Sequence, residues 1–190
     1  MPIVINGSAG TVTGVATGGL PDGCVDTDTL ATSVTRGNIL QVVQHSFSDE
    51  TSSTSTSDTA IIGSAKALTL TSSSSSVLII ANIYVSHYRQ YSGNGVSLTL
   101  RKTVSGGSIT DIYEPKDGGQ MMSIDTSQLA TTDQRGMQTL MHIDTPGNTG
   151  VTYELSGRCY TNANGGRFRV NETDSGDTAH SRIVFLEIAA

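Results

Sequence analysis

Val77-Leu78-Ile79-Ile80-Ala81 is the longest apolar run in the chain, and it follows a low-complexity serine stretch at 72–76. Five residues fall far short of the ~20 that cross a bilayer as a helix. A short apolar run that starts after turn residues is typical of a strand buried in a sheet. We therefore expect residues 77–85 to form the central strand of a sheet.

Strand signals recur on both sides of this run, separated by segments rich in Gly, Ser, Asn and Asp. Apolar and polar residues alternate at 68–70 and again at 96–100, a pattern typical of strands with one solvated face. About eight or nine short strands with such turns predict an all-β fold, an antiparallel β-sandwich that is jelly-roll-like. The other predicted strands are residues 39–47, 109–113, 137–143, 151–155, 167–170 and 182–188.

The composition also favours strands over helices. Ser and Thr make up about a quarter of the 190 residues, Gly accounts for 21, and charged residues for only 15%, against ~25% in an average domain. Long helices favour Ala, Leu, Glu and Lys instead. Because soluble monomers usually carry more charge, the low charge suggests that other subunits cover part of the surface.

The charge pattern argues against two classes of partner. The net charge is −6, and no run of Lys and Arg could neutralise successive phosphates, so we expect no nucleic-acid binding. No apolar stretch is long enough for a spanning helix, so we expect no membrane insertion. Residues 1–5 lack the basic and long apolar regions of a signal peptide, which predicts synthesis in the cytoplasm.

The first 37 residues differ from the rest because they are Gly-rich and contain too few apolar side chains for a core. Asn6-Gly7 between β-forming runs predicts a hairpin, and residues 18–23 form a dense turn cluster. We expect this extended segment to become ordered by docking. The chain is thus divided into an N-terminal docking segment, 1–37, and a β-sandwich domain, 38–190. The candidate anchoring residues are Leu20, Pro21, Asp22, Gly23 and Leu30.

Several stretches of the chain resemble one group of proteins. They are Gly18-Gly19-Leu20-Pro21-Asp22-Gly23, Asp28-Thr29-Leu30-Ala31, Ile39-Leu40-Gln41-Val42-Val43-Gln44, the run at 77–81, and Ser181-Arg182-Ile183-Val184-Phe185-Leu186-Glu187-Ile188. Together they resemble structural proteins of tailed-phage virions, especially tail-fibre-like and minor structural proteins of marine and cyanobacterial phages.

The resemblance implies a virion component that is synthesised in the host cytoplasm and attached by its N-terminus to other virion proteins of the tail or capsid. It also implies a homotrimer that presents its sandwich outward, and it implies no catalytic residue. The chain lacks the long repetitive shaft of a fibre. A short appendage or a capsid decoration protein therefore stays open beside the fibre interpretation.

Nothing in the sequence predicts a catalytic, metal or cofactor site. No nucleophile elbow, P-loop or zinc-protease motif is present. The histidines are scattered, and turn or capping roles explain the paired aspartates, so we expect no metal. Two cysteines lie far apart, and the sequence leaves open whether they pair. These residues are His45, His87, His142, His180, Asp26, Asp28, Asp174, Asp177, Cys24 and Cys159.

The best candidate for a contact surface lies at the end of the predicted central strand. Tyr and Arg supply contact area and directional hydrogen bonds, which interfaces favour. The cluster continues into residues 92–95, which we expect to be a hairpin tip. Three interpretations stay open: a receptor contact, a contact between subunits, and ordinary turn residues. The cluster comprises Tyr84, His87, Tyr88, Arg89, Tyr91 and Asn94.

Our leading hypothesis is a tail-fibre-like virion structural protein, anchored by its N-terminal segment, whose sandwich attaches to a host surface polysaccharide or receptor. Several weak sites on one particle would then gain avidity. The alternative is a capsid decoration or cement protein that stabilises the head. A carbohydrate-active virion enzyme is disfavoured because the chain has no Trp and only 5% aromatic residues for sugar stacking. We therefore expect no enzymatic activity.

Overall fold

The computed structural model describes residues 4–6, 11–13, 38–89, 95–114, 122–123, 132–160, 165–173 and 179–190. The chain divides into two units, residues 1–36 and 37–190. In the first unit, β1 (Val4–Asn6) and β2 (Thr11–Thr13) form the antiparallel pair that Asn6-Gly7 predicted. Every element of the described residues is a strand. Among them there is accordingly no helix long and apolar enough to cross a membrane.

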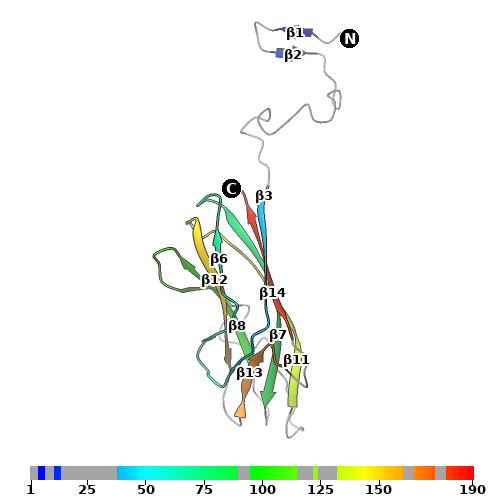
Figure 1. The fold of residues 1–190 in the computed structure, drawn as a ribbon, viewed down its shortest axis with the longest axis vertical. Coiled ribbons are helices and arrows are strands. Elements are labelled where there is room, and N and C mark those ends of the chain that lie inside the picture. The colour runs from blue at the N-terminus through cyan, green and yellow to red at the C-terminus, as the bar shows by residue number, and fades with distance from the viewer. Residues whose placement is uncertain are drawn as a thin grey trace. The chain divides into compact units, whose positions relative to one another are not determined.

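The second unit contains two antiparallel sheets (Figure 1). In the first sheet, β7 lies between β11 on one side and β14 and β13, placed end to end, on the other. Strands β3 and β4 form the outer edge beside β14 and β13. The bounds are β3 (Ile39–Phe47), β4 (Thr51–Ser53), β7 (Ser76–Arg89), β11 (Thr132–Asp144), β13 (Arg167–Val170) and β14 (Ser181–Ile188).

The second sheet is built around β8 and β12, which pair with each other. Strands β9 and β10 flank β8, and β5 and β6 flank β12. The bounds are β5 (Thr59–Ala60), β6 (Lys66–Thr69), β8 (Gly95–Val104), β9 (Thr110–Tyr113), β10 (Met122–Ser123) and β12 (Gly150–Cys159).

The order of the strands is that of a jelly roll. When β3/β4, β5/β6, β9/β10 and β13/β14 each count as one position, the first position pairs with the last, the second with the second-last, and so on inward. A two-sheet sandwich wound this way is a jelly roll, so the predicted fold is confirmed. Strands β7 and β8 belong to different sheets. They therefore do not form the hairpin expected around 92–95, and residues 92–94 themselves lie outside the described residues.

The hydrophobic core lies between the two sheets. Alternate side chains of β7, from Val77 to Val85, are fully buried, as the apolar run predicted. The rings of Tyr153 on β12 and Phe185 on β14 stack across the core with centroids 5.6 Å apart. Burying an apolar side chain of this kind contributes roughly 1.5–3 kcal/mol. The core thus holds the two sheets together.

One local expectation was wrong. The polar residues Ser97 and Thr99 of β8 were expected on a solvated face but are 2% and 1% exposed. Neighbouring segments cover them: Glu114 accepts a hydrogen bond from Ser97 Oγ at 2.8 Å. The alternation of apolar and polar residues predicted that β8 has two different faces. It did not predict that neighbouring segments cover the polar face.

A buried polar pair joins the ends of β13 and β14 to β7. Residue 84 of β7 lies where its partner changes from β14 to β13. There Ser181 Oγ accepts a hydrogen bond from Tyr84 N at 3.0 Å, and Asn171 N donates to Tyr84 O at 3.0 Å. Ser181 Oγ in turn donates to Asn171 Oδ1 at 2.6 Å. Asn171 has φ +54°, a conformation that Asn tolerates better than most residues.

A buried carboxylate closes the end of the sandwich at which β3 begins. Glu187 is 1% exposed and accepts hydrogen bonds from Gln41 Nε2 at 2.6 Å and from Thr71 N at 2.7 Å. Burial alone would raise the pKa of Glu187, but these hydrogen bonds outweigh it and hold the pKa below the ordinary 4.5. The charged carboxylate therefore links β3, β14 and the segment after β6.

We expect Glu187→Gln to lower the free energy of unfolding by about 2 kcal/mol, because hydrogen bonds to a charged acceptor are lost. The folded pKa of Glu187 is depressed, so its stabilising effect is fully present above pH 4.5 and is lost as the pH falls through the folded value. Denaturant unfolding at neutral and acid pH should show the two proteins converging in acid. A constant difference at all pH values would contradict this role.

Candidate functional site

The predicted contact cluster does not form one surface. The Tyr84 side chain faces outward on β7 and is half-buried, whereas His87 is 0% exposed and faces the core. The prediction that His87 shares a surface with Tyr84 is wrong, because positions 84 and 87 fall on opposite faces of a strand. Tyr88 and Arg89 complete β7, and their backbone alone is described. Tyr91 and Asn94 lie outside the described residues, as do the anchoring candidates at 20–23 and Leu30.

The other chemistry-bearing residues show no common site. Within the described parts of the chain, no three His, Cys, Asp or Glu side chains lie close enough to hold a metal ion. His45 Nε2 lies 2.7 Å from the carbonyl oxygen of Gly63, and the His142 ring stacks on Tyr113 with centroids 4.9 Å apart. The aspartates at 26, 28, 174 and 177 and the thiol of Cys24 lie outside the described residues.

A surface that the sequence analysis missed covers the outer face of the first sheet. Residues directly opposite each other in register share a face, and one row across all four strands is apolar: Val42, Leu186, Leu78 and Ile143. The next row contains Val184, Ile80 and Met141. With Ile188 at the end of β14, we call these eight residues the apolar face.

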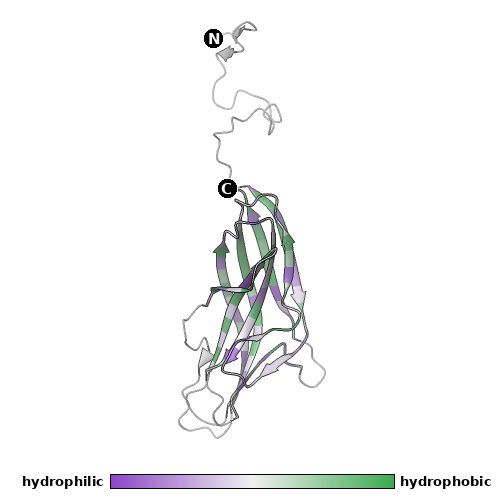
Figure 2. Ribbon diagram, turned by 90° about the vertical axis from the view of Figure 1, so that its left-hand side faces the viewer, coloured by the Kyte–Doolittle hydropathy of each residue, from purple (hydrophilic) through white to green (hydrophobic). Residues whose placement is uncertain are grey.

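The apolar face is open to solvent in the single chain. Val42, Met141 and Ile143 are 61%, 63% and 59% exposed, and the other five are half-buried. In Figure 2 the strands of the sandwich are coloured most strongly as hydrophobic toward the end that carries the C-terminus. The face therefore leaves a contiguous apolar area without cover by any described residue.

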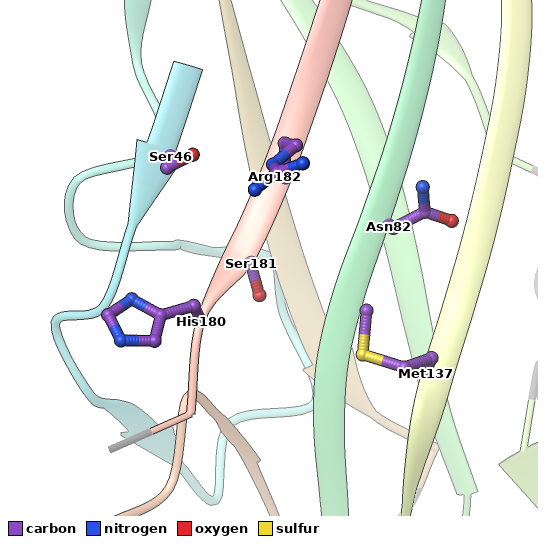
Figure 3. Close-up of a pocket in the computed structure, with 6 residues that line it drawn as sticks. All are labelled: Ser46, Asn82, Met137, His180, Ser181 and Arg182. Carbon is purple, nitrogen blue, oxygen red and sulfur yellow. The ribbon is translucent and has the colours of Figure 1, made fainter. Parts of the chain in front are cut away.

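Beyond this face, the same sheet becomes polar. A depression of about 480 Å³ begins at the next row, where Arg182 and Asn82 lie opposite each other, and it extends past Met137 to His180 (Figure 3). Farther along the strands, Arg135 and Arg169 lie on either side of Ser86. Both arginines pair with the buried Glu172. The outer face thus changes from apolar to basic along the strand direction.

The outer face of the second sheet has a different character. It is polar and carries ion pairs that tie neighbouring strands together. Arg158 Nη2 lies 2.5 Å from Glu114 Oε1, and Arg101 Nε lies 2.7 Å from Asp111 Oδ1. Such pairs suit a surface that faces water. The two outer faces of the sandwich are therefore not equivalent.

The apolar face had a signal in the sequence. Residues 77–81 are apolar without alternation, and residues 183–186 repeat this in β14. We interpreted such a run as a strand buried in the centre of a sheet. The structure buries one face of the strand in the core and leaves the other without a described neighbour. The sequence thus indicated that both faces are apolar, but not that one of them stays uncovered by the described residues.

Comparisons with known proteins add little to this description. Neither the known protein families nor the curated proteins include a match to the sequence. Among solved structures, a chain in the structure of infectious bursal disease virus, Gx strain, is similar with a TM-score of 0.30 and 13% identity. The likeness covers 79% of this chain and 37% of that one, so this chain spans just over a third of it. A likeness this distant assigns no function.

The buried thiol of Cys159 should be chemically inert. Its side chain is 1% exposed, its Sγ donates to Ser53 O at 3.5 Å, and burial raises its pKa to about 11. In a Cys24→Ser variant, we expect a thiol-specific reagent at pH 8 to label Cys159 only after denaturation. A thiol pKa two units higher leaves roughly a hundredfold less thiolate to react. Rapid labelling of the folded protein would contradict the burial of this residue.

Proposed function

We propose that this chain is a non-enzymatic, tail-fibre-like virion structural protein. In this proposal residues 1–37 attach it to the particle, and the far end of the sandwich contacts the host surface. The resemblance of residues 18–31 and of the strand segments to tailed-phage structural proteins supports the virion assignment. The observation that carries the proposal is that the two ends of the sandwich differ. Asn38, which follows the N-terminal segment, lies at one end, and the candidate contact residues at the end of β7 lie at the other.

The attachment end is defined by the two termini of the sandwich. Ala189 N donates a hydrogen bond to Asn38 O at 3.0 Å, and Ile188 pairs with Ile39. The described body therefore begins at the end where the C-terminus lies, as Figure 1 shows for β3 and the C-terminus. Ser76, the first residue of β7, pairs with Ile188 at the same end.

The distal end is reached along β7. From Ser76 to Arg89 the strand rises ~3.3 Å per residue, so its last residue lies roughly 43 Å from the attachment end. The next described residue, Gly95, begins β8, and Tyr91 and Asn94 between them lie outside the described residues. Tyr160, which is 56% exposed and donates its backbone N–H to Gly95 O at 2.9 Å, lies at this end as well.

These distal side chains suit recognition of a polysaccharide or a protein receptor. Tyrosine offers a flat apolar ring together with a hydroxyl, and Arg89 adds directional donors. A single contact of this kind would be weak. Several copies on one particle would bind together, so the particle would adhere more tightly than any one sandwich.

A capsid decoration protein is the second candidate, and the apolar face favours it. A decoration protein has to cover neighbouring coat subunits, and an open apolar sheet face could do so. In that case a labelled antibody should decorate the head of the particle in electron micrographs, whereas the tail-fibre proposal requires decoration of the tail.

We expect deletion of residues 1–37 to leave a folded sandwich that no longer joins virions, because the docking segment is lost. The measurement is the amount of the protein in purified particles, with circular dichroism of the truncated protein as the control for folding. Normal incorporation of the truncated protein would contradict the anchoring assignment.

We expect Tyr88→Ala combined with Tyr160→Ala to slow adsorption of particles to host cells at least tenfold, because avidity multiplies the loss at each site. Ile109→Ala is the matched control, since Ile109 is exposed but lies beyond the β8 end opposite Gly95. Incorporation into particles should stay normal for both. Equal adsorption of the two variants would argue against a distal contact surface.

A further inference from the structure

The apolar face has the composition of a surface that is buried in an assembly. Nine large apolar side chains are exposed among the described residues, and three of them, Val42, Met141 and Ile143, belong to the apolar face. Ile39, Leu40 and Met137 are exposed on the same two outer strands, β3 and β11. Contiguous exposed apolar areas on this scale mark interaction sites, whereas single exposed apolar residues do not.

The size of the sheet matches a stable protein interface. Its four strand positions are spaced ~4.8 Å apart, and β7 with its 14 residues rises ~3.3 Å per residue. The outer face of the sheet therefore covers on the order of 800 Å², which is close to what each partner contributes to a standard interface. The apolar half would supply the core of that interface and the polar half its rim.

We propose that further copies of this chain cover the apolar face, packed in parallel around an axis that runs along the strands. The face carries no charge, so its partner surface has to be apolar too, and on the described sandwich this face itself is the surface that qualifies. The described outer face of the second sheet, with Arg101 and Arg158 in ion pairs, does not. The parallel direction rests on the proposed anchoring function, whereas the self-association does not.

The change from apolar to charged residues along the first sheet favours copies that pack with their strands in the same direction. In a parallel arrangement each apolar row meets an apolar row at the same height, and the arginine-bearing halves meet at the distal end. An antiparallel arrangement with full overlap would bring the charged group of Arg135, Arg169 and Glu172 of one copy against the apolar half of the next. Removing charged groups from water without giving them new polar contacts is costly, so such a pair would keep only about half of the face in contact.

The parallel arrangement also suits the position of the termini. Every copy has Asn38 at the apolar end of the sheet, beside Ala189. All N-terminal segments would therefore leave the assembly at one end, as attachment to a single place on a particle requires. The trimer implied by the resemblance is one such arrangement.

The test replaces an exposed apolar residue on the face by a charge. We expect the full chain to be oligomeric in native mass spectrometry and sedimentation equilibrium. Val42→Asp and Met141→Lys should each weaken association by roughly a hundredfold, equivalent to about 2.7 kcal/mol. Thr69→Asp is the matched control, because Thr69 is an exposed strand position on the polar sheet. Its association should equal that of the wild type.

Folding is monitored in parallel by circular dichroism, and a variant that unfolds is set aside in favour of the other. A monomeric wild-type chain would overturn the proposal, as would oligomers that Val42→Asp and Met141→Lys leave intact. If the wild type is monomeric and Val42→Asp is lost from particles, a different virion chain covers the face, which also overturns self-association. An oligomer that is absent from virions would contradict the proposed function and leave the self-association standing.

The direction is tested with a short-range donor–acceptor pair of fluorophores, whose transfer distance is well below the length of the sandwich, on Asn38→Cys in the Cys24→Ser variant, since Cys159 is buried. Mixed donor- and acceptor-labelled chains should show efficient energy transfer, because parallel packing gathers all residues 38 at one end. Weak transfer, as expected for labels at opposite ends of sandwiches roughly 43 Å long, would overturn the parallel arrangement.

Discussion

The fold depends on β7, a 14-residue strand that pairs on both edges and is apolar on both faces over its first half. One face supplies Val77, Ile79 and Ala81 to the core. The other places Leu78 and Ile80 in the middle of the apolar face. Because side chains alternate along a strand, a sequence that is apolar at successive positions has to bury both faces. The described strands of the sandwich bury only one of these faces, and the assembly that we propose would bury the second.

The outer faces of the two sheets differ in chemical character. The second sheet keeps polar side chains and ion pairs on its outer face, so it suits solvent. The first sheet changes from an apolar half near the termini to a basic half near the end of β7. If copies associate through the apolar half, the anchoring segments are gathered at one end and the tyrosine-bearing ends are presented together at the other. The difference between the two outer faces and the change along the first sheet thus both support the proposed parallel packing of copies through the apolar half.

The fold was predictable from the sequence to the level of a jelly-roll-like sandwich, because the run at 77–81 and the alternation at 68–70 set the strand positions. The site was not. His87 looked like part of a contact cluster because it lies near tyrosines in sequence, yet its parity on β7 directs it into the core. The expected hairpin at 92–95 failed because turn residues do not distinguish a hairpin from a crossing between sheets. Strand register, which the sequence does not encode locally, brings Val42, Leu186, Leu78 and Ile143 into one row.

The solvent exposure of Met141 in the full protein tests most directly whether copies of the chain cover the apolar face. In one chain its side chain is 63% exposed on β11, at one edge of the apolar face. If copies cover this face, mild peroxide should oxidise Met141 much more slowly in concentrated protein than after dilution below the dissociation constant of the assembly. Mass spectrometry of tryptic peptides would follow the sulfoxide. Oxidation at the rate of a free methionine at every concentration would contradict the burial of this face.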